Sequence, residues 1–226
     1  MPIKATYINH MGNDLTVANA ARVSFGKTSE MEDDPWGPPK LKAKDDKLIR
    51  YLSKHRHISP FGHCFASFHV KAPIYVARQL VKHKFLRWNE ISRRYVKDEP
   101  EFYTPKLRAA AKDKKQGSGD PLILSIQQDE VIRHAHIEAV KQYRYLLQTG
   151  VCEEQARGIL PLNHMTEWYW SGSLDAFADM CNLRCKDDTQ YETRLLADNI
   201  NEEMSKLFPV SWKALVHDNK ESGNGC

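Results

Sequence analysis

The chain has 226 residues, of which 41% are hydrophobic and 27% charged, with a formal net charge of +4 at pH 7. These values are ordinary for a globular protein with a real core, and the net charge is too small to imply general nucleic-acid binding. No apolar run reaches the roughly 18 residues of a membrane span, and the first residues, MPIKATYINH, lack the apolar core of a secretory signal. We therefore expect a cytoplasmic protein with no membrane partner.

The first half of the chain is predicted to alternate strands and helices. Asn13 or Asp14 is placed to cap a helix, and Gly26 ends it. Residues 26–40, rich in Gly, Pro and acidic residues, predict a loop. Alternating apolar residues predict a half-buried strand, after which Pro73 suits the first position of a helix. The predicted ranges are 3–9 and 64–71 for strands, and 13–26, 43–55 and 73–83 for helices.

The second half is predicted to be mainly helical. Asp120-Pro121 is expected to cap a long helix that Gly150 stops. The other predicted ranges are 82–94 and 111–120 for loops, 152–160, 173–184 and 188–207 for helices, and 166–173 for a strand. Because no internal repeat or linker is visible, we expect one α+β domain over residues 1–216, with a mostly antiparallel sheet flanked by helices, and a flexible tail at 217–226.

The segment Arg78–Lys97 carries the strongest functional signal. It contains seven basic residues and one acidic residue, Glu90, a local excess of +6. Such a density must face solvent, an acidic partner or an anionic ligand, because unpaired charge is costly to bury. Asn89 and Glu90 would be out of place in a patch that binds only phosphate, and Arg157 and Arg184 lie in otherwise apolar surroundings. These observations favour a phosphate-bearing ligand over a solvated face.

Other clusters have structural interpretations. The histidine-rich segment 55–63 with Cys64 matches no structural zinc spacing, so we predict no metal site. Cys181 and Cys185 are one helical turn apart and are expected to face the core. Five scattered cysteines in all indicate free thiols in a reducing compartment. The aromatic run Trp168–Trp170 is expected in the core rather than as a stacking platform.

A set of ordered motifs resembles one family. Lys82-His83-Lys84, followed after seven residues by Ser92, resembles the Arg-His-Arg-x7-Ser motif of flavin-dependent thymidylate synthases. The block 72–95 resembles versions of this enzyme carried by bacteriophages. The other segments that resemble the family, in its order, are MGNDL (11–15), AARVSF (20–25), KHxHxSPFxH (54–63), FHVKAPIxVARQ (68–79), WNEISxRY (88–95), EFY (101–103), EQARxILPLN (154–163), NLR (182–184) and QYE (190–192).

The resemblance implies an activity and an assembly. It implies an α+β fold, a homotetramer, and FAD sites built where subunits meet. It also implies methylation of dUMP at C5 to give dTMP, with 5,10-methylenetetrahydrofolate as the carbon donor and NADPH as the reductant of the flavin. Neither nucleic acid nor a membrane is expected as a partner, and a phage-encoded enzyme would act in the host cytoplasm.

The resemblance also implies roles for individual residues. Arg184 aligns with the arginine thought to polarise the pyrimidine and favour ionisation at N3, and Ser92 shares the catalytic assignment. The positions implied to contact FAD are Ser24, His57, Ser59, Lys82, His83, Lys84, Asn89, Glu90, Ser173 and Asp179. The positions implied to hold dUMP are Gln79, Lys82, Glu90, Ser92, Arg93, Arg94, Arg157 and Arg184.

The chemistry of the residues agrees with a route that needs no thiolate. C5 of uracil is a weak nucleophile, and classical thymidylate synthases activate it with a cysteine that follows a proline. None of the five cysteines here follows a proline. A guanidinium at the ring carbonyls can instead stabilise developing enolate charge, by roughly a few kcal/mol in a dry site.

The chain also departs from the family pattern. Lysines replace two arginines at Lys82 and Lys84, which keeps the charge but loses the planar bidentate fork. Asp175 and Asp188 stand where the family more often has Arg and His, on the adenine side of FAD. Two alternatives remain open: a hydroxymethylase or related enzyme that modifies C5 of a pyrimidine nucleotide, and a single-strand nucleic-acid binder that uses the basic loop and the tryptophan cluster.

Overall fold

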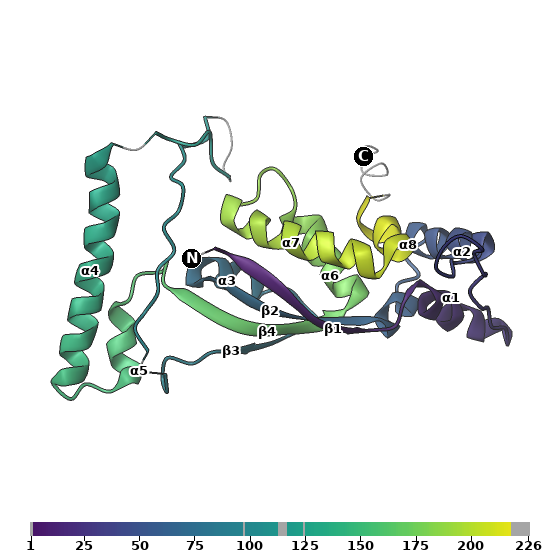
Figure 1. The fold of residues 1–226 in the computed structure, drawn as a ribbon, viewed down its shortest axis with the longest axis horizontal. Helices are drawn as coiled ribbons and strands as arrows, with labels where there is room; N and C mark the ends of the chain where they lie inside the picture. The colour runs from purple at the N-terminus through teal and green to yellow at the C-terminus, as the bar shows by residue number, and fades with distance from the viewer. Residues whose placement is uncertain (1, 97, 113–116, 124, 218–226) are drawn as a thin grey trace.

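A four-stranded antiparallel sheet forms the centre of the protein, whose structure is a computed structural model (Figure 1). The structure describes residues 2–96, 98–112, 117–123 and 125–217, so residues 218–226 of the predicted tail and part of the predicted 111–120 loop lie outside it. The strand order is β1-β2-β4-β3. The strands are β1 (Lys4–Met11), β2 (Phe65–Pro73), β3 (Leu86–Glu90) and β4 (Met165–Ser173). The predicted single α+β domain with an antiparallel sheet is confirmed.

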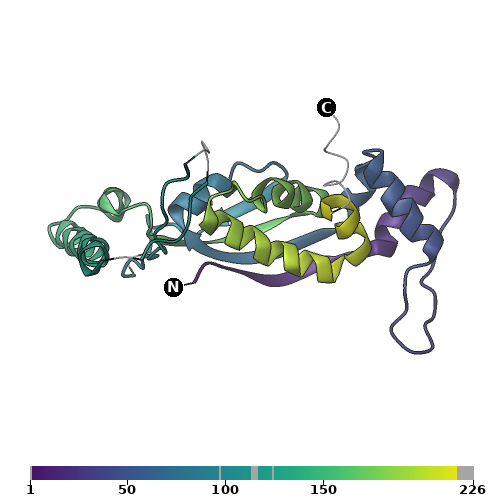
Figure 2. The same ribbon diagram turned by 90° about the horizontal axis from the view of Figure 1, so that it is seen from above.

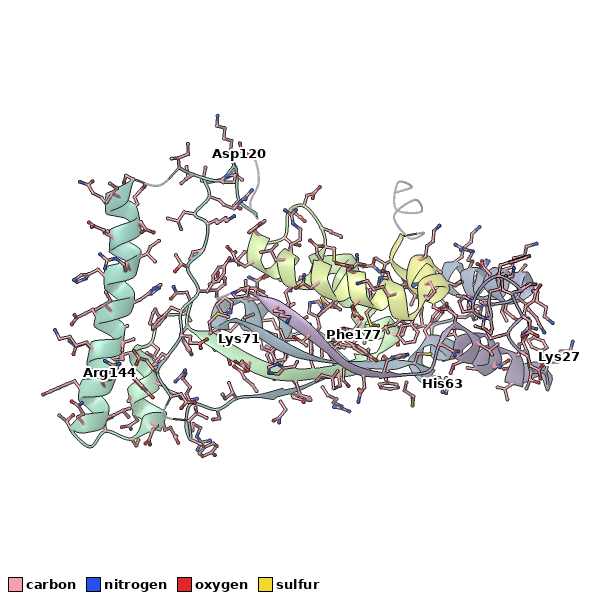
Figure 3. All side chains as sticks on the ribbon, in the orientation of Figure 1. Lys27, His63, Lys71, Asp120, Arg144 and Phe177 are labelled. Atoms are coloured by element: carbon pink, nitrogen blue, oxygen red, sulfur yellow. The ribbon has the colours of Figure 1, made fainter. Side chains whose placement is uncertain are left out.

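Helices cover one face of this sheet. Figures 1 and 2 show α6 (Leu174–Arg184) and α7 (Tyr191–Leu207) across that face, with α3 (Ile74–Leu80) beside them. Phe177 of α6 lies between the two layers (Figure 3), where its ring meets the edges of Phe68 and Trp170 at centroid distances of 5.3 and 5.5 Å. The core therefore sits between the sheet and α6–α7.

The helices at the far end of the sheet are tied to the C-terminal helices. They are α1 (Asp14–Arg22) and α2 (Ala43–Lys54), next to α8 (Pro209–Trp212) and a π-helical turn, Lys213–His217. Asn13, one of the two predicted caps, caps α1 through a capping box with Thr16. The predicted helix end at Gly26 is wrong, because α1 ends at Arg22 and a 3-10 turn, Val23–Phe25, precedes Gly26. The buried Asp14 carboxylate accepts hydrogen bonds from the backbone N–H groups of Val210 and Ser211, at 3.0 and 2.8 Å.

A helical arm stands away from the sheet at the other end (Figure 1). It consists of α4 (Ile126–Gln148), α5 (Glu153–Ala156) and a 3-10 turn, Arg157–Ile159, and has a small core around Tyr143. The predicted start of α4 at Asp120-Pro121 is wrong. Ser125 and Gln128 form a capping box that satisfies the first backbone donors, so the helix begins after Ser125.

Two further predictions near the basic segment are wrong. Pro73 is the last residue of β2 and the N-cap of α3 rather than its first residue, and α3 ends at Leu80 rather than 83. The predicted 82–94 loop contains β3, in which Leu86, Trp88 and Glu90 are half-buried between exposed residues. The alternation suits a strand with one solvated face. Among the described residues, no helix is long and apolar enough to cross a membrane.

Candidate active site

The lysine-histidine-lysine triplet lies in the turn from α3 into β3, which is an edge strand. Phe85, with a positive φ of 63°, reverses the chain there. Lys82, Lys84 and the β3 residue Arg87 are exposed, and none has an ion-pair partner in the part of the chain that the structure describes. The His83 ring is half-buried beneath them. The turn and the start of β3 therefore offer three cations to an anionic ligand.

A first pocket of about 480 Å³ is lined by residues of the sheet, of α3 and of the arm. The Glu90 carboxylate lines it and accepts hydrogen bonds from the Trp88 ring N–H (3.1 Å) and the Thr166 hydroxyl (2.6 Å). These donors come from β3 and β4, so the sheet itself fixes the carboxylate. The other ionisable residues that line the pocket are Lys71, Arg78, Arg93, Asp98, Glu99, Glu101, Arg157, His164 and Glu167.

Charges of both signs line this pocket, with four Lys or Arg side chains and five carboxylates. Burial is the largest cause of the lowered pKa of His164; Arg93 and Arg157 also lower it, whereas the hydrogen bond to Pro161 and the Glu90 charge raise it. The ring is therefore neutral near pH 7. Its Nδ1–H donates to the Pro161 carbonyl at 3.0 Å, which leaves Nε2 as an acceptor. A hydrogen bond from Lys71 to Glu101, at 2.7 Å, is the main cause of the raised pKa of Lys71. The pocket thus combines fixed cations with fixed acceptors.

A second pocket, of about 360 Å³, lies between α3 and the residues that follow α6. Gln79, Arg184 and Gln190 line it. The Arg184 Nε–H donates to His83 Nε2 at 3.1 Å, and its terminal N–H donates to the Gln79 carbonyl oxygen at 3.2 Å. Burial, and then the charge of Arg184, lowers the pKa of His83 to about 4. His83 is therefore a neutral acceptor that orients the guanidinium.

A third group of predicted residues lines neither of these two pockets. Ser24, His57 and Ser59 are exposed, and Ser173 is buried as the N-cap of α6. Burial raises the pKa of Asp179, and the charge of Arg56 partly offsets this rise. The Oδ1 atom of Asp175 is buried and has no hydrogen-bond partner among the described residues.

The described side chains fit a flavin dinucleotide. The unpaired Asp175 oxygen suits a ligand hydroxyl or amino donor, because a buried acceptor without a partner is costly. The Lys82, Lys84 and Arg87 cations suit a diphosphate. No group of three or more metal-ligating side chains occurs in the part of the chain described.

One chain does not bring all of the predicted residues together. Glu90, Arg93 and Arg157 line the first pocket, whereas Gln79 and Arg184 line the second. Ser92 and Arg94 line neither; the Ser92 hydroxyl accepts from the Arg94 N–H at 3.4 Å, and the Arg94 guanidinium pairs with Glu154. Asn89 is exposed on β3 beside Glu90.

Several lining residues were not among the predicted site residues. Arg78, Thr166 and His164 belong to the first pocket and Gln190 to the second. Arg78 stood in the predicted basic cluster, and Gln190 in a segment that resembles the family. Thr166 and His164 carried no signal, because only strand pairing brings them next to Glu90.

An α+β fold with arginine side chains in two pockets and exposed lysines in a nearby turn suits anionic, nucleotide-like ligands. Residues 6–210 match the family model described as "Thymidylate synthase complementing protein". The flavin-dependent thymidylate synthase of Thermus thermophilus is 39% identical over 208 residues, which cover 92% of this chain and 73% of the relative. That of Thermotoga neapolitana is 37% identical over 209 residues, covering 92% and 88%. The chain belongs to the family of flavin-dependent thymidylate synthases, which are methyltransferases.

Solved structures show the same likeness. A crystal structure of the UMP/dUMP methylase PolB from Streptomyces cacaoi, bound with 5-Br dUMP, superposes with a TM-score of 0.79 at 29% identity and covers 94% of each chain. The same methylase bound with 5-Br UMP superposes with a TM-score of 0.80 at 28% identity, covering 95% of this chain and 93% of the other. The family predicted from the order of the motifs is confirmed.

Proposed function

We propose that this protein converts dUMP to dTMP by reductive methylation at C5. The carbon donor is 5,10-methylenetetrahydrofolate, and FAD reduced by NADPH is the source of hydride. The observation that carries the proposal is Arg184, whose guanidinium is held by His83 and by the Gln79 carbonyl at the wall of a pocket, in a chain that belongs to this family.

We assign the activation of C5 to Arg184 and not to either of the two buried thiols. Burial raises the pKa of Cys64 to about 12, and it also raises the pKa of the buried Cys181. Neither thiol is therefore ionised near neutral pH. Arg184 keeps N–H groups that are not used by His83 or Gln79, and these can donate to a uracil carbonyl as negative charge develops there.

The remaining predicted residues hold the ligands. Lys82, Lys84 and His83 would hold FAD together with Ser59 and Asp179, and the other proposed contacts are Ser24, His57, Asn89, Glu90 and Ser173. When bound, the flavin supplies the hydride that completes the methyl group. Arg93, Arg94 and Arg157 would hold dUMP with Gln79, Glu90 and Ser92. Their cations match the single phosphate of a nucleotide.

We infer that several copies of the chain complete each site, as a homotetramer. The predicted dUMP residues are divided between two pockets of one chain. The sheet face opposite α6 and α7 leaves Phe65 and Tyr169 exposed at 43% and 54%, and Phe85 is exposed at 81%. Burial of these side chains against a second copy would stabilise an assembly. Because its ligands are nucleotides of the cytoplasm, we place the enzyme there, in the host cytoplasm if it is phage-encoded.

A product assay tests the proposed reaction. Purified protein is supplied with FAD, NADPH, dUMP and a folate deuterated at its transferred carbon, and the nucleotide is analysed by mass spectrometry. A deuterated methyl group at C5 is expected. A hydroxymethyl group would overturn the proposal in favour of a hydroxymethylase, and a colourless protein with steeply salt-dependent binding to oligonucleotides would overturn it in favour of a nucleic-acid binder.

A parallel reaction with UMP tests the sugar preference. PolB, the similar solved protein, is a UMP/dUMP methylase. Preferential turnover of dUMP is expected, and faster turnover of UMP would contradict the proposed substrate.

A further inference from the structure

A chain of side-chain hydrogen bonds lies behind the second pocket. The Thr193 hydroxyl donates to Gln79 Oε1 at 3.1 Å, and Gln79 Nε2 donates to Gln190 Oε1. Gln190 Nε2 donates in turn to Glu192 Oε2 at 3.1 Å. Thr193 is completely buried and Glu192 is 6% exposed, whereas Gln79 and Gln190 line the pocket. The chain thus links a buried carboxylate to the pocket wall.

The carboxylate sets the direction of every bond in this chain. An ionised carboxylate only accepts hydrogen bonds, so Gln190 must turn its NH2 group toward Glu192. The Gln190 oxygen then faces Gln79, so the Gln79 NH2 group must donate to it. If the Gln79 amide alone reversed, its oxygen would face the oxygen of Gln190. If Gln190 reversed as well, the Gln190 oxygen would face the Glu192 carboxylate, and both arrangements leave acceptors unpaired.

Glu192 is an unusual residue to bury. Among the described residues it has no ion-pair partner, and its carboxylate accepts a side-chain hydrogen bond from Gln190 alone. Burial raises the pKa of Tyr75 and Tyr103, and the nearby Glu192 charge raises both further, so both phenols lie close to the carboxylate. A buried carboxylate without a cation costs stability, which fits a role in function rather than in folding.

We propose that Glu192 is a positioning residue that, through Gln190, locks the Gln79 amide in one orientation and thereby makes the pocket select a uracil ring over a cytosine ring. The inference rests on the proposed function, which places a pyrimidine in this pocket.

Uracil and cytosine present opposite hydrogen-bonding patterns. Uracil has a carbonyl acceptor at C4 and a donor at N3, whereas cytosine has an amino donor at C4 and an acceptor at N3. A free glutamine amide can rotate to match either ring, but a locked one matches only one. Arg184, next to Gln79, offers donors only and so also favours the carbonyl of uracil. Loss of the lock should therefore relax the choice of base.

Binding of dUMP and dCMP to the FAD-loaded, full-length protein tests the lock. In Glu192→Gln the hydrogen bonds between the amides can run in either direction. The dissociation constant of dCMP divided by that of dUMP should therefore fall by about tenfold or more, mainly because dUMP binds more weakly. The matched control is Glu202→Gln, which removes an exposed carboxylate that pairs with Lys206 on the same helix and should leave the ratio unchanged. An unchanged ratio in Glu192→Gln would overturn the proposal.

Exchange of the residue types at positions 190 and 192 tests whether the orientation of the Gln79 amide, rather than the packing of Glu192, sets the preference for dUMP. Gln190→Glu alone places two carboxylates in contact, so it should lower both the preference for dUMP and the midpoint of urea unfolding. The double variant Gln190→Glu/Glu192→Gln again gives Gln79 a pure acceptor at position 190, and it should recover both properties. A double variant as impaired as Gln190→Glu would contradict the lock.

The two readouts distinguish this inference from the proposed function. Urea unfolding needs no nucleotide, so recovery of the midpoint supports the bond chain even in a protein that does not bind dUMP, and failure to recover counts against it. Wild-type protein that binds neither nucleotide would overturn the proposed function and, with it, the role of the lock in base selection.

Discussion

At the scale of single residues, the proposed mechanism depends on a neutral histidine beside an arginine. His83 accepts a hydrogen bond from Arg184 because burial and the adjacent guanidinium hold its pKa at about 4. A protonated imidazole would lose this acceptor and would repel the arginine. The same contact that orients Arg184 therefore also makes it sensitive to acid.

Replacement of Arg184 by alanine should abolish turnover. The variant loses the only donor that we assign to the developing carbonyl charge, and kcat should fall by at least about a hundredfold. Flavin absorbance and the midpoint of thermal unfolding should stay close to those of the wild type. Arg133→Ala, at a position on α4 away from both pockets, is the matched control. Wild-type turnover in Arg184→Ala would remove this residue from the mechanism.

Replacement of His83 by asparagine should alter the pH dependence of stability. Between pH values of about 6.5 and 4 the unfolded chain binds a proton at His83 that the folded protein does not bind. The free energy of unfolding of the wild type therefore falls as the pH is lowered through this window. Urea unfolding at several pH values should show a smaller fall in His83→Asn. Parallel curves for the two proteins would mean that His83 is not buried in its neutral form.

Ser92→Ala should reduce turnover more than it reduces stability. The Ser92 hydroxyl makes only a long hydrogen bond, from the Arg94 N–H, among the described residues, so its removal costs the fold little. Steady-state kinetics and thermal unfolding of the same preparation would separate the two effects. Normal turnover would show that Ser92 has a structural role only.

At the scale of elements, the pairing of β3 with β4 builds the first pocket. This pairing sets Glu90 opposite Trp168 and Leu86 opposite Gly172. A β-carbon at Gly172 would clash with the Leu86 side chain and lie 2.9 Å from the Phe85 carbonyl oxygen. Gly172 therefore permits the close approach of β3.

The substitution Gly172→Ala should separate the two strands. Overpacking of this kind costs about 1–3 kcal/mol, and the accompanying shift of β3 would move Glu90 and the Lys82–Lys84 turn. Urea unfolding should show the loss of stability, and titration with FAD should show weaker binding. Ser171→Ala, one residue earlier on the same strand, is the control. Unchanged stability and FAD binding in Gly172→Ala would contradict the close packing.

The sequence predicted elements well where the apolar pattern was plain. The β2 and β4 strands and the burial of Trp168 and Trp170 followed from alternation and aromatic content. The predicted burial of Tyr169 is wrong, because it lies on the other face of β4 and is 54% exposed. The β3 strand was missed because it lies in a basic segment and has only two apolar residues, Leu86 and Trp88, on its half-buried face. The division of the site into two pockets depends on strand register and helix packing, which no local pattern records.

At the scale of the whole molecule, one chain divides the predicted dUMP residues between two pockets and leaves aromatic side chains exposed on one face of the sheet. A homotetramer would bring complementary pockets together and cover exposed aromatic side chains. Light scattering should therefore give the mass of four chains, and a monomer that is fully active would contradict shared sites.

Growth of a thymidine-requiring bacterium without thymidine is the most direct test of the central claim. We expect the wild-type gene to restore growth and the gene for Arg184→Ala not to do so, although both proteins are produced and bind flavin. Failure of the wild type to restore growth, or growth with Arg184→Ala, would contradict a flavin-dependent methylation that depends on this arginine.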